Sequence, residues 1–227
     1  MVNHDLFGKK AYVTKYVDQA NIKMKLAEAV LPAGTEFSWN DPENNLIMVI
    51  LDGTLMVNGA GVGTKNTTVV LPAGRQTDLV VDMKSGVHAM VMVKKAPNLL
   101  AKPLIVNEDD RIWLPDYENG HFHLYLKNLL TPDQIGGCVM KLTYPAGHIT
   151  EWHDHTFTHA AYVLNGVFVN ETEDDEGEQY FGPGSFICGP KGQIMRHGAA
   201  DEQSCDCYFF TDAPFSLHYV DKVEKKK

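Results

Sequence analysis

The sequence lacks any apolar run that approaches the roughly 18 residues of a membrane-spanning helix, and its helical periodicity is weak throughout. It is also short of basic residues, with Lys+Arg 20 against Asp+Glu 29 and a formal net charge of −9. That balance argues against a nucleic-acid partner, and the absent apolar run argues against a membrane. The first residues carry no basic segment followed by an apolar stretch, so a secretion signal is not expected and the prediction is a cytoplasmic protein.

Cysteine is scarce as well, with four residues at Cys138, Cys188, Cys205 and Cys207. They do not form two metal-knuckle pairs, and they are too sparse for a secreted disulfide scaffold. Cys205 and Cys207 share one face of a predicted strand. A zinc or redox role for this pair stays open beside the simpler interpretation of two small buried residues.

What the sequence does contain is short apolar runs separated by turn residues. Glycine 19 and proline 11 fall between runs such as Asn45–Val49, Val87–Val93 and Ala160–Leu164. Runs of this length, divided by turns, indicate an all-β sandwich or barrel. A short helical turn is expected only near Thr131–Ile135, where Thr-Pro-Asp resembles an N-cap followed by proline.

An internal repeat sets the domain organisation. Leu31–Gly34 and Tyr144–Gly147 have similar sequences and lie 113 positions apart. The same offset, or one of 110, pairs further positions along the chain: Tyr12 with Tyr125, Gly53 with Gly166, and Leu71–Gly74 with Phe181–Gly184. The chain is therefore predicted to hold two copies of one β-rich unit of about 110 residues. We expect domains over 1–105 and 106–227.

Three histidines lie close together in the second copy. His153, His155 and His159 share the same parity between Gly147 and Gly166. Side chains alternate along a strand, so His153 and His155 are expected on one face. Imidazole is the commonest ligand for metals such as Zn, Fe, Ni and Cu. Buried histidines are also frequent as ordinary core residues, and that interpretation stays open for each one alone.

At these residues the sequence resembles the cupin superfamily. The first cupin motif is glycine, five residues, His-x-His, three or four residues, glutamate, six residues and glycine. Gly147, His153, His155 and Gly166 match it, and His159 stands in the place of the glutamate.

The second cupin motif is glycine, five residues, Pro-x-Gly, two residues and histidine. Gly184, Pro190 and Gly192 match it, but His197 follows after four residues, which a β-bulge could absorb. The resemblance implies two tandem cupin-type β-barrels (double-stranded β-helix or jelly-roll), a bicupin. It also implies one divalent metal ion per chain, held by the second barrel on His153, His155, His159 and His197.

The first copy lacks these ligands. At the aligned positions it has Asn40, Pro42 and Leu46, and His88 is the only histidine placed somewhat as His197 is. A single histidine does not hold a metal tightly. The amino-terminal barrel is therefore expected to be structural or to bind something without metal.

Four neutral imidazoles would leave a divalent ion its full charge and two open coordination positions. The resemblance implies a metal-dependent enzyme, and we expect a non-haem iron dioxygenase acting on a small oxygenated substrate of the β-diketone or hydroxyketone type. Zn, Mn or Ni remain possible metals. The alternatives are a redox-neutral isomerase or hydrolase on a small acid or sugar, and a non-catalytic small-molecule binding or sensor protein.

For further residues near the motif, the alternation of side chains along a strand predicts which face each one occupies. Glu151 shares the parity of His153 and is the expected catalytic group, although a solvated rim position is the other interpretation. His121 and His123 are expected on a polar edge strand or at the mouth of the barrel. Trp39 and Trp152 are 113 positions apart at outward parity, and we expect their faces to pack barrel on barrel or to form a homodimer.

Overall fold

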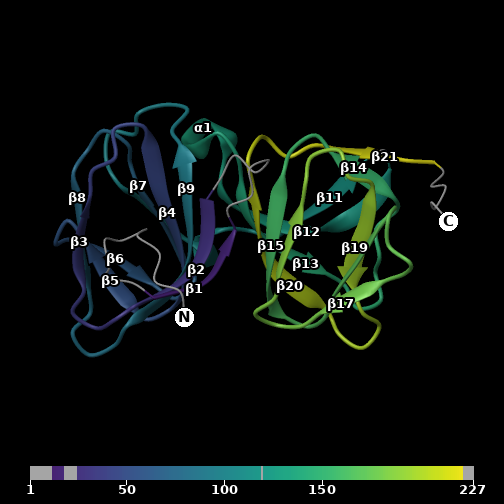
Figure 1. The fold of residues 1–227 in the computed structure, drawn as a ribbon, viewed down its shortest axis with the longest axis horizontal. Helices are drawn as coiled ribbons and strands as arrows, with labels where there is room; N and C mark the ends of the chain where they lie inside the picture. The colour runs from purple at the N-terminus through teal and green to yellow at the C-terminus, as the bar shows by residue number, and fades with distance from the viewer. Residues whose placement is uncertain (1–11, 18–24, 119, 222–227) are drawn as a thin grey trace. The chain divides into compact units, whose positions relative to one another are not determined.

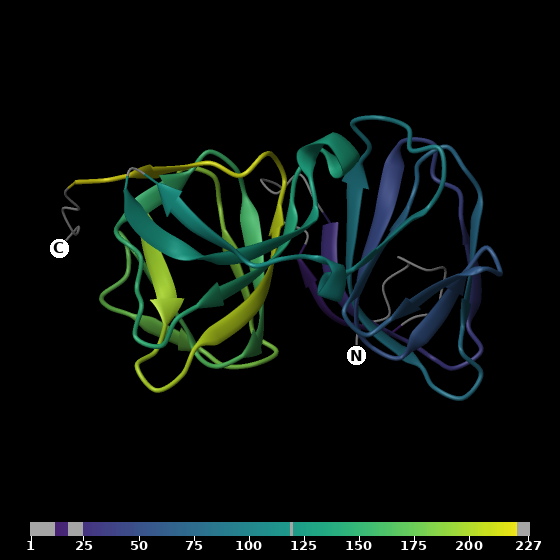
Figure 2. The same cartoon turned by 180° about the vertical axis from the view of Figure 1, so that it is seen from behind.

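The computed structural model describes residues 12–17, 25–118 and 120–221. The chain divides into two compact units, the first covering 1–110 together with 133–136 and the second covering 111–132 and 137–227. Each unit is built of antiparallel strands that curl into a barrel (Figures 1 and 2). The expected all-β fold with two β-barrels is confirmed.

The first unit contains two sheets. The larger has the order β1 (Tyr12–Val17), β2 (Lys25–Leu31), β9 (Val87–Lys95), β4 (Asn44–Asp52), β7 (Thr67–Leu71) and β10 (Leu104–Asn107). The smaller has the order β3 (Glu36–Trp39), β8 (Thr77–Val81), β5 (Thr54–Val57) and β6 (Gly61–Thr64). Aliphatic side chains fill the space between them, among them Leu46, Leu55 and Leu79.

The second unit repeats this plan. Its larger sheet has the order β11 (Leu114–Glu118), β12 (His121–Leu130), β13 (Val139–Tyr144), β20 (Cys205–Thr211), β15 (His159–Asn165) and β18 (Phe186–Gly189). Its smaller sheet has the order β17 (Gln179–Phe181), β16 (Phe168–Thr172), β19 (Met195–Ala199), β14 (His153–His155) and β21 (Leu217–Tyr219).

The register of the strands follows the sequence repeat. Tyr12 pairs with Val30 in the first unit, and Tyr125 pairs with Thr143 in the second, so both partners move by 113 positions. The β4–β5 turn and the β15–β16 turn each need glycine for the same reason. Gly53 and Gly166 have φ values of 89° and 75°, and an added Cβ would lie 2.0 Å and 2.2 Å from a facing carbonyl oxygen.

The division between the units falls later than the expected border at 105/106. β10 crosses that border and pairs with β7 of the first unit, so the first unit extends to Asp110. Helix α1 (Pro132–Ile135) lies where a helical turn was expected. Its residues from Asp133 onward group with the first unit.

Cys205 and Cys207 lie in the core of the second unit, and neither forms a disulfide. Burial raises the pKa of the Cys205 thiol to about 12 and holds the pKa of the Cys207 thiol well above its usual range, so both stay protonated at neutral pH. These properties are those of small buried residues and not of a reactive pair.

The two tryptophans with matching positions are both half-buried. Trp39 packs against the core of the first unit and donates a hydrogen bond to the Asn44 carbonyl oxygen at 3.1 Å. Trp152 lies under the guanidinium of Arg196, 5.2 Å from its ring centroid. The homodimer stays a prediction.

In the described residues no helix is both long and apolar enough to cross a membrane. The start of the chain, where no secretion signal was expected, lies outside those residues.

Candidate metal centre

Five histidines come together inside the second barrel. They lie on four strands, and each is at most 4% exposed: His123 on β12, His153 and His155 on β14, His159 on β15, and His197 on β19. The ring centroids of His153 and His197 are 4.8 Å apart, and those of His155 and His159 are 4.6 Å apart. The four sequence-predicted ligands are therefore neighbours in space, and His123 joins them.

Three of these rings bring one nitrogen atom each to a common centre. One nitrogen from each of His123, His153 and His197 lies within 4.8 Å of the other two. The Nε2 atoms of His153 and His197 are 3.1 Å apart. Three imidazole nitrogens grouped in this way could hold a transition-metal ion in their midst.

Hydrogen bonds at Nδ1 fix the orientation of the His123 and His153 rings. Nδ1 of His153 lies 2.7 Å from the Glu151 carbonyl oxygen, and Nδ1 of His123 lies 3.0 Å from a carboxylate oxygen of Asp116. Both partners are acceptors, so each Nδ1 carries the proton and each Nε2 presents its lone pair to the centre. Metal-binding histidines commonly have their tautomer set in this way.

Several nitrogens inside the barrel lack a hydrogen-bond partner. Among the described residues they are Nε2 of His123, Nδ1 of His197 and Nδ1 of His159, and the nitrogens of His155 have only a weak contact with the Ser216 main chain. A buried polar atom left unpaired normally destabilises the fold by about 1–3 kcal/mol. A metal ion takes one nitrogen from each ring, so an ion in the centre would satisfy Nε2 of His123 and could satisfy one nitrogen of His155. To that extent the residues suit the metal that the sequence resemblance implies.

Burial keeps these rings neutral. Burial, with a smaller contribution from nearby His123, lowers the pKa of His153 to about 4, and burial lowers that of His159 to about 3. The pKa values of His155 and His197 are also pushed well below the usual range, first by burial and then by neighbouring histidines. Neutral imidazole is the form that binds a metal, so the ligands need not lose a proton near pH 7.

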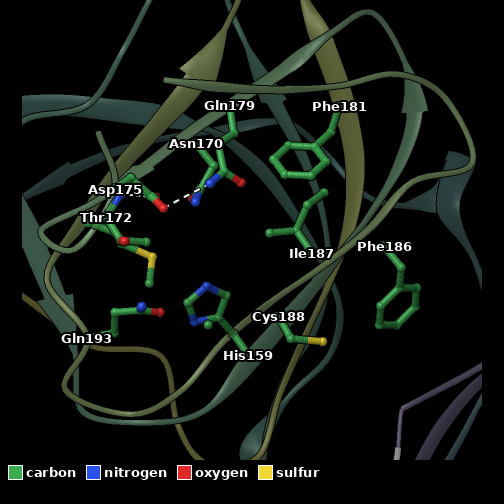
Figure 3. Close-up of a pocket in the computed structure, with 12 residues that line it drawn as sticks. His159, Asn170, Thr172, Asp175, Gln179, Phe181, Phe186, Ile187, Cys188 and Gln193 are labelled. Carbon is green, nitrogen blue, oxygen red and sulfur yellow. Dashed lines mark hydrogen bonds between the residues drawn. The ribbon is translucent and has the colours of Figure 1, made fainter. Parts of the chain in front are cut away.

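His159 lies apart from the closest three. Its ring stacks on Phe209, with centroids 4.8 Å apart, and it forms part of the wall of a separate pocket. Figure 3 shows the ring at that pocket, with Cys188 and Gln193 nearby. Gly189 makes the room, since a Cβ there would lie 2.3 Å from His159 Cε1.

The second motif departs from the expected bulge. The four residues between Gly192 and His197 begin in the turn that precedes β19, and β19 pairs with β16 without a register shift. Gly192 has φ 79°, and its N–H donates to the His155 carbonyl oxygen at 2.9 Å. The two extra residues are therefore absorbed by the turn, and His197 still faces the barrel interior.

Two expectations based on parity do not match the structure. Glu151 is exposed, and it meets the cluster only through its main-chain carbonyl, because β14 begins at His153 and the preceding residues do not alternate as a strand does. His123 is fully buried while His121 is exposed. The β11–β12 pairing changes register between Asp116 and Tyr117, which breaks the simple alternation. A carboxylate seven residues before a histidine was the signal available for His123.

The first barrel has no such cluster among its described residues. Asn40 and Pro42 are exposed, and Leu46 belongs to the aliphatic core. His88 is not the counterpart of His197, because it lies on β9 and its Nε2 is 2.7 Å from a Glu28 carboxylate oxygen. The matching hydrogen bonds of Val81 and Ala199 instead align His197 with the buried Leu79.

Comparison with solved structures gives the fold. A cupin 2 conserved barrel domain protein from Leptotrichia buccalis has a TM-score of 0.63 and 10% identity over 88% of each chain. A candidate dioxygenase from Nostoc punctiforme has a TM-score of 0.67 and 14% identity over 98% of this chain and 78% of that one. A formate complex of oxalate decarboxylase from Lactobacillus farciminis has a TM-score of 0.67 and 8% identity, with 96% and 90% covered.

No protein-family model and no curated protein matches the chain. At 8–14% identity the structural likenesses establish the fold alone. The resemblance to two-barrel cupins seen in the sequence is confirmed at that level. A fold of this kind hosts many reactions, so the function has to be argued from the site.

Proposed function

We propose that the second barrel holds one divalent metal ion on His123, His153 and His197, and that the protein is a metal-dependent enzyme. The observation that carries this proposal is the convergence of three imidazole nitrogens within 4.8 Å. The hydrogen bonds at Nδ1 of His123 and His153 support it, because they leave each Nε2 free to bind. When bound, the ion would supply Lewis acidity and, if it is iron, redox chemistry.

His155 is the neighbour best placed to join the three. Its ring lies nearly parallel to that of His197, at 6.0 Å and 14°, and neither of its nitrogens makes a well-formed hydrogen bond. We call His123, His153 and His197 the triad. The sequence-predicted ligand set of His153, His155, His159 and His197 shares His153 and His197 with it. We favour His123 as the third ligand and place His159 at the pocket, because its ring lies beside Phe209 and Gly189.

The reaction we propose is that of an iron dioxygenase on a small oxygenated substrate. All candidate ligands are neutral, so an ion here would keep its positive charge and favour an oxygen-bearing substrate. The likeness to a candidate dioxygenase agrees with this proposal, and the likeness to an oxalate decarboxylase keeps a redox-neutral reaction as the second candidate.

Oxygen consumption tests this proposal. Protein loaded with Fe²⁺ is given acetylacetone or hydroxyacetone in an oxygen-electrode cell. We expect oxygen uptake that depends on substrate, disappears in His153→Ala and persists in His88→Ala, which alters a histidine of the other barrel. Substrate loss without oxygen uptake would favour the redox-neutral reaction. Metal binding without any turnover would favour a small-molecule sensor.

A further inference from the structure

A pocket of about 280 Å³ lies in the second barrel, on the side where His159 is found (Figure 3). Its deepest residues are buried: His159, Asn170, Thr172, Gly189 and Met195. Asp175, Gln179 and Gln193 lie nearer to solvent. The volume is at the low end for ligand pockets, so it suits a small molecule.

The polar groups left free in this pocket are uncharged. Asp175 is the one carboxylate among the lining residues, and both of its oxygens are occupied. One oxygen accepts from the Thr172 N–H at 2.8 Å, and the other accepts from the Gln179 side-chain amide at 2.8 Å. Figure 3 shows this second bond beside Asn170. Within the described chain, the Asn170 carboxamide has no such partner, and it remains available to a ligand.

The lining also lacks a group that would neutralise an anion. No lysine or arginine is among the residues that surround this pocket in the described chain. Binding a ligand that carries a carboxylate would therefore be strongly unfavourable, because its charge would be buried without a cationic partner. The apolar part of the lining includes Phe181, Phe186 and Ile187. The pocket therefore suits a molecule that combines hydrogen-bonding groups with a short hydrocarbon part.

We propose that this pocket binds a small uncharged molecule that carries hydroxyl, carbonyl or carboxamide groups beside a short apolar part. Asn170 and His159 recognise its polar end, and Phe181 and Ile187 contact its apolar end. This inference rests on the proposed function for its catalytic meaning, because the His155 ring, 4.6 Å from that of His159, lies between the pocket and the triad. The inference favours uncharged oxygenated substrates over the small acids of the alternative reaction.

Gly189 acts as a positioning residue for this pocket. An added Cβ would lie 2.3 Å from Cε1 and 2.5 Å from Nε2 of His159, and 2.8 Å from the terminal methyl of Met195. A methyl group at this position would push both side chains out of place. Gly189→Ala is therefore expected to abolish ligand binding without removing any polar group.

The test is a titration with two probes, hydroxyacetone and acetate, followed by the histidine-ring signals in ¹H–¹³C NMR. The His159 signal is assigned by its loss in His159→Phe. We expect hydroxyacetone to shift that signal saturably and acetate to bind at least tenfold more weakly. Asn170→Ala should weaken hydroxyacetone binding at least fivefold. The matched control Gln203→Ala, at a different cavity of the same barrel, should leave it unchanged.

Three results would overturn the inference: acetate binding as tightly as hydroxyacetone, an unmoved His159 signal, or no effect of Asn170→Ala. Gln193→Lys adds a check of sign, since a cation at the rim should improve acetate binding. The titration is run on protein with and without bound metal. Saturable hydroxyacetone binding in a protein that takes up no metal would refute the proposed function and leave this inference standing. Metal uptake in a protein that does not bind hydroxyacetone would refute this inference and leave the proposed function standing.

Discussion

The two barrels share a backbone and differ in what fills them. Where the second barrel carries His159 and His197, the first carries Leu46 and Leu79, all four buried. The pairing of Tyr12 with Val30 matches that of Tyr125 with Thr143, and the left-handed Gly53 matches Gly166. The comparison teaches that turns and apolar alternation specify this fold, whereas a few inward-facing positions decide whether a barrel offers a metal site or a packed core.

The largest loss of stability is expected when the turn glycine that both barrels share is substituted. Gly53→Ala and Gly166→Ala would each place a methyl group about 2 Å from a facing carbonyl oxygen and strain a backbone with positive φ. We expect each to lower the free energy of unfolding by about 3 kcal/mol or more, measured by urea titration followed by circular dichroism. Gly59→Ala, at φ 69° with nothing within 4 Å, isolates the backbone strain and should cost about 1 kcal/mol. Equal effects at all three glycines would contradict this prediction.

The next prediction concerns the positions at which the barrels differ. Leu46→Ala should lower the free energy of unfolding by about 3 kcal/mol, because it leaves a cavity in an aliphatic core. His159→Leu, at the matching position, should leave the stability of metal-free protein unchanged or raise it, because it removes a buried nitrogen without a partner. Urea titrations of the two variants check this contrast. A large loss in His159→Leu would show that the histidine is part of the packing.

A third prediction separates the barrels by pH. The pKa of His153 is lowered to about 4 and that of His159 to about 3 in the folded protein, whereas an unfolded histidine titrates near 6.5. As pH falls below 6.5, the unfolded chain therefore takes up protons that the folded second barrel does not. Without metal, that barrel should lose stability between about pH 6.5 and 4, by about 1.4 kcal/mol per pH unit for each proton. Amide hydrogen exchange, read separately in each barrel, measures this loss. A slope that is unchanged in His153→Gln/His159→Gln would count against it.

Much of this architecture was predictable because its determinants are local. Turn glycines and short apolar runs lie at a fixed offset, and both are visible along the chain. The burial of His153, His155, His159 and His197 in one cluster followed from the same pattern. His123 was not placed, because the register change between Asp116 and Tyr117 depends on the pairing of two strands. The pocket around Asn170 also has no sequence pattern, since its residues come from strands and turns brought together only by the fold.

The smallest expected effect sharpens the choice of ligands. If His159 binds the metal, His159→Glu should shift the pH at which the protein releases metal, because it replaces a neutral imidazole ligand by a charged carboxylate. The triad predicts instead that native protein and His159→Glu release metal along the same pH curve. His123→Gln should weaken metal binding about tenfold or more. Dialysis at stepped pH followed by elemental analysis gives both curves, and the opposite ranking of the two variants would assign the site to the sequence-predicted set.

The most direct test of the central claim is the number of metal ions per chain. Protein purified without an affinity tag is analysed for Fe, Zn, Mn and Ni, together with His153→Ala, His197→Ala and the first-barrel control His88→Ala. We predict about one ion per chain in native protein and in His88→Ala, and none in the two second-barrel variants. Two tightly held ions per chain, or one ion that survives the loss of His153 and of His197, would contradict the claim that the second barrel alone holds the metal.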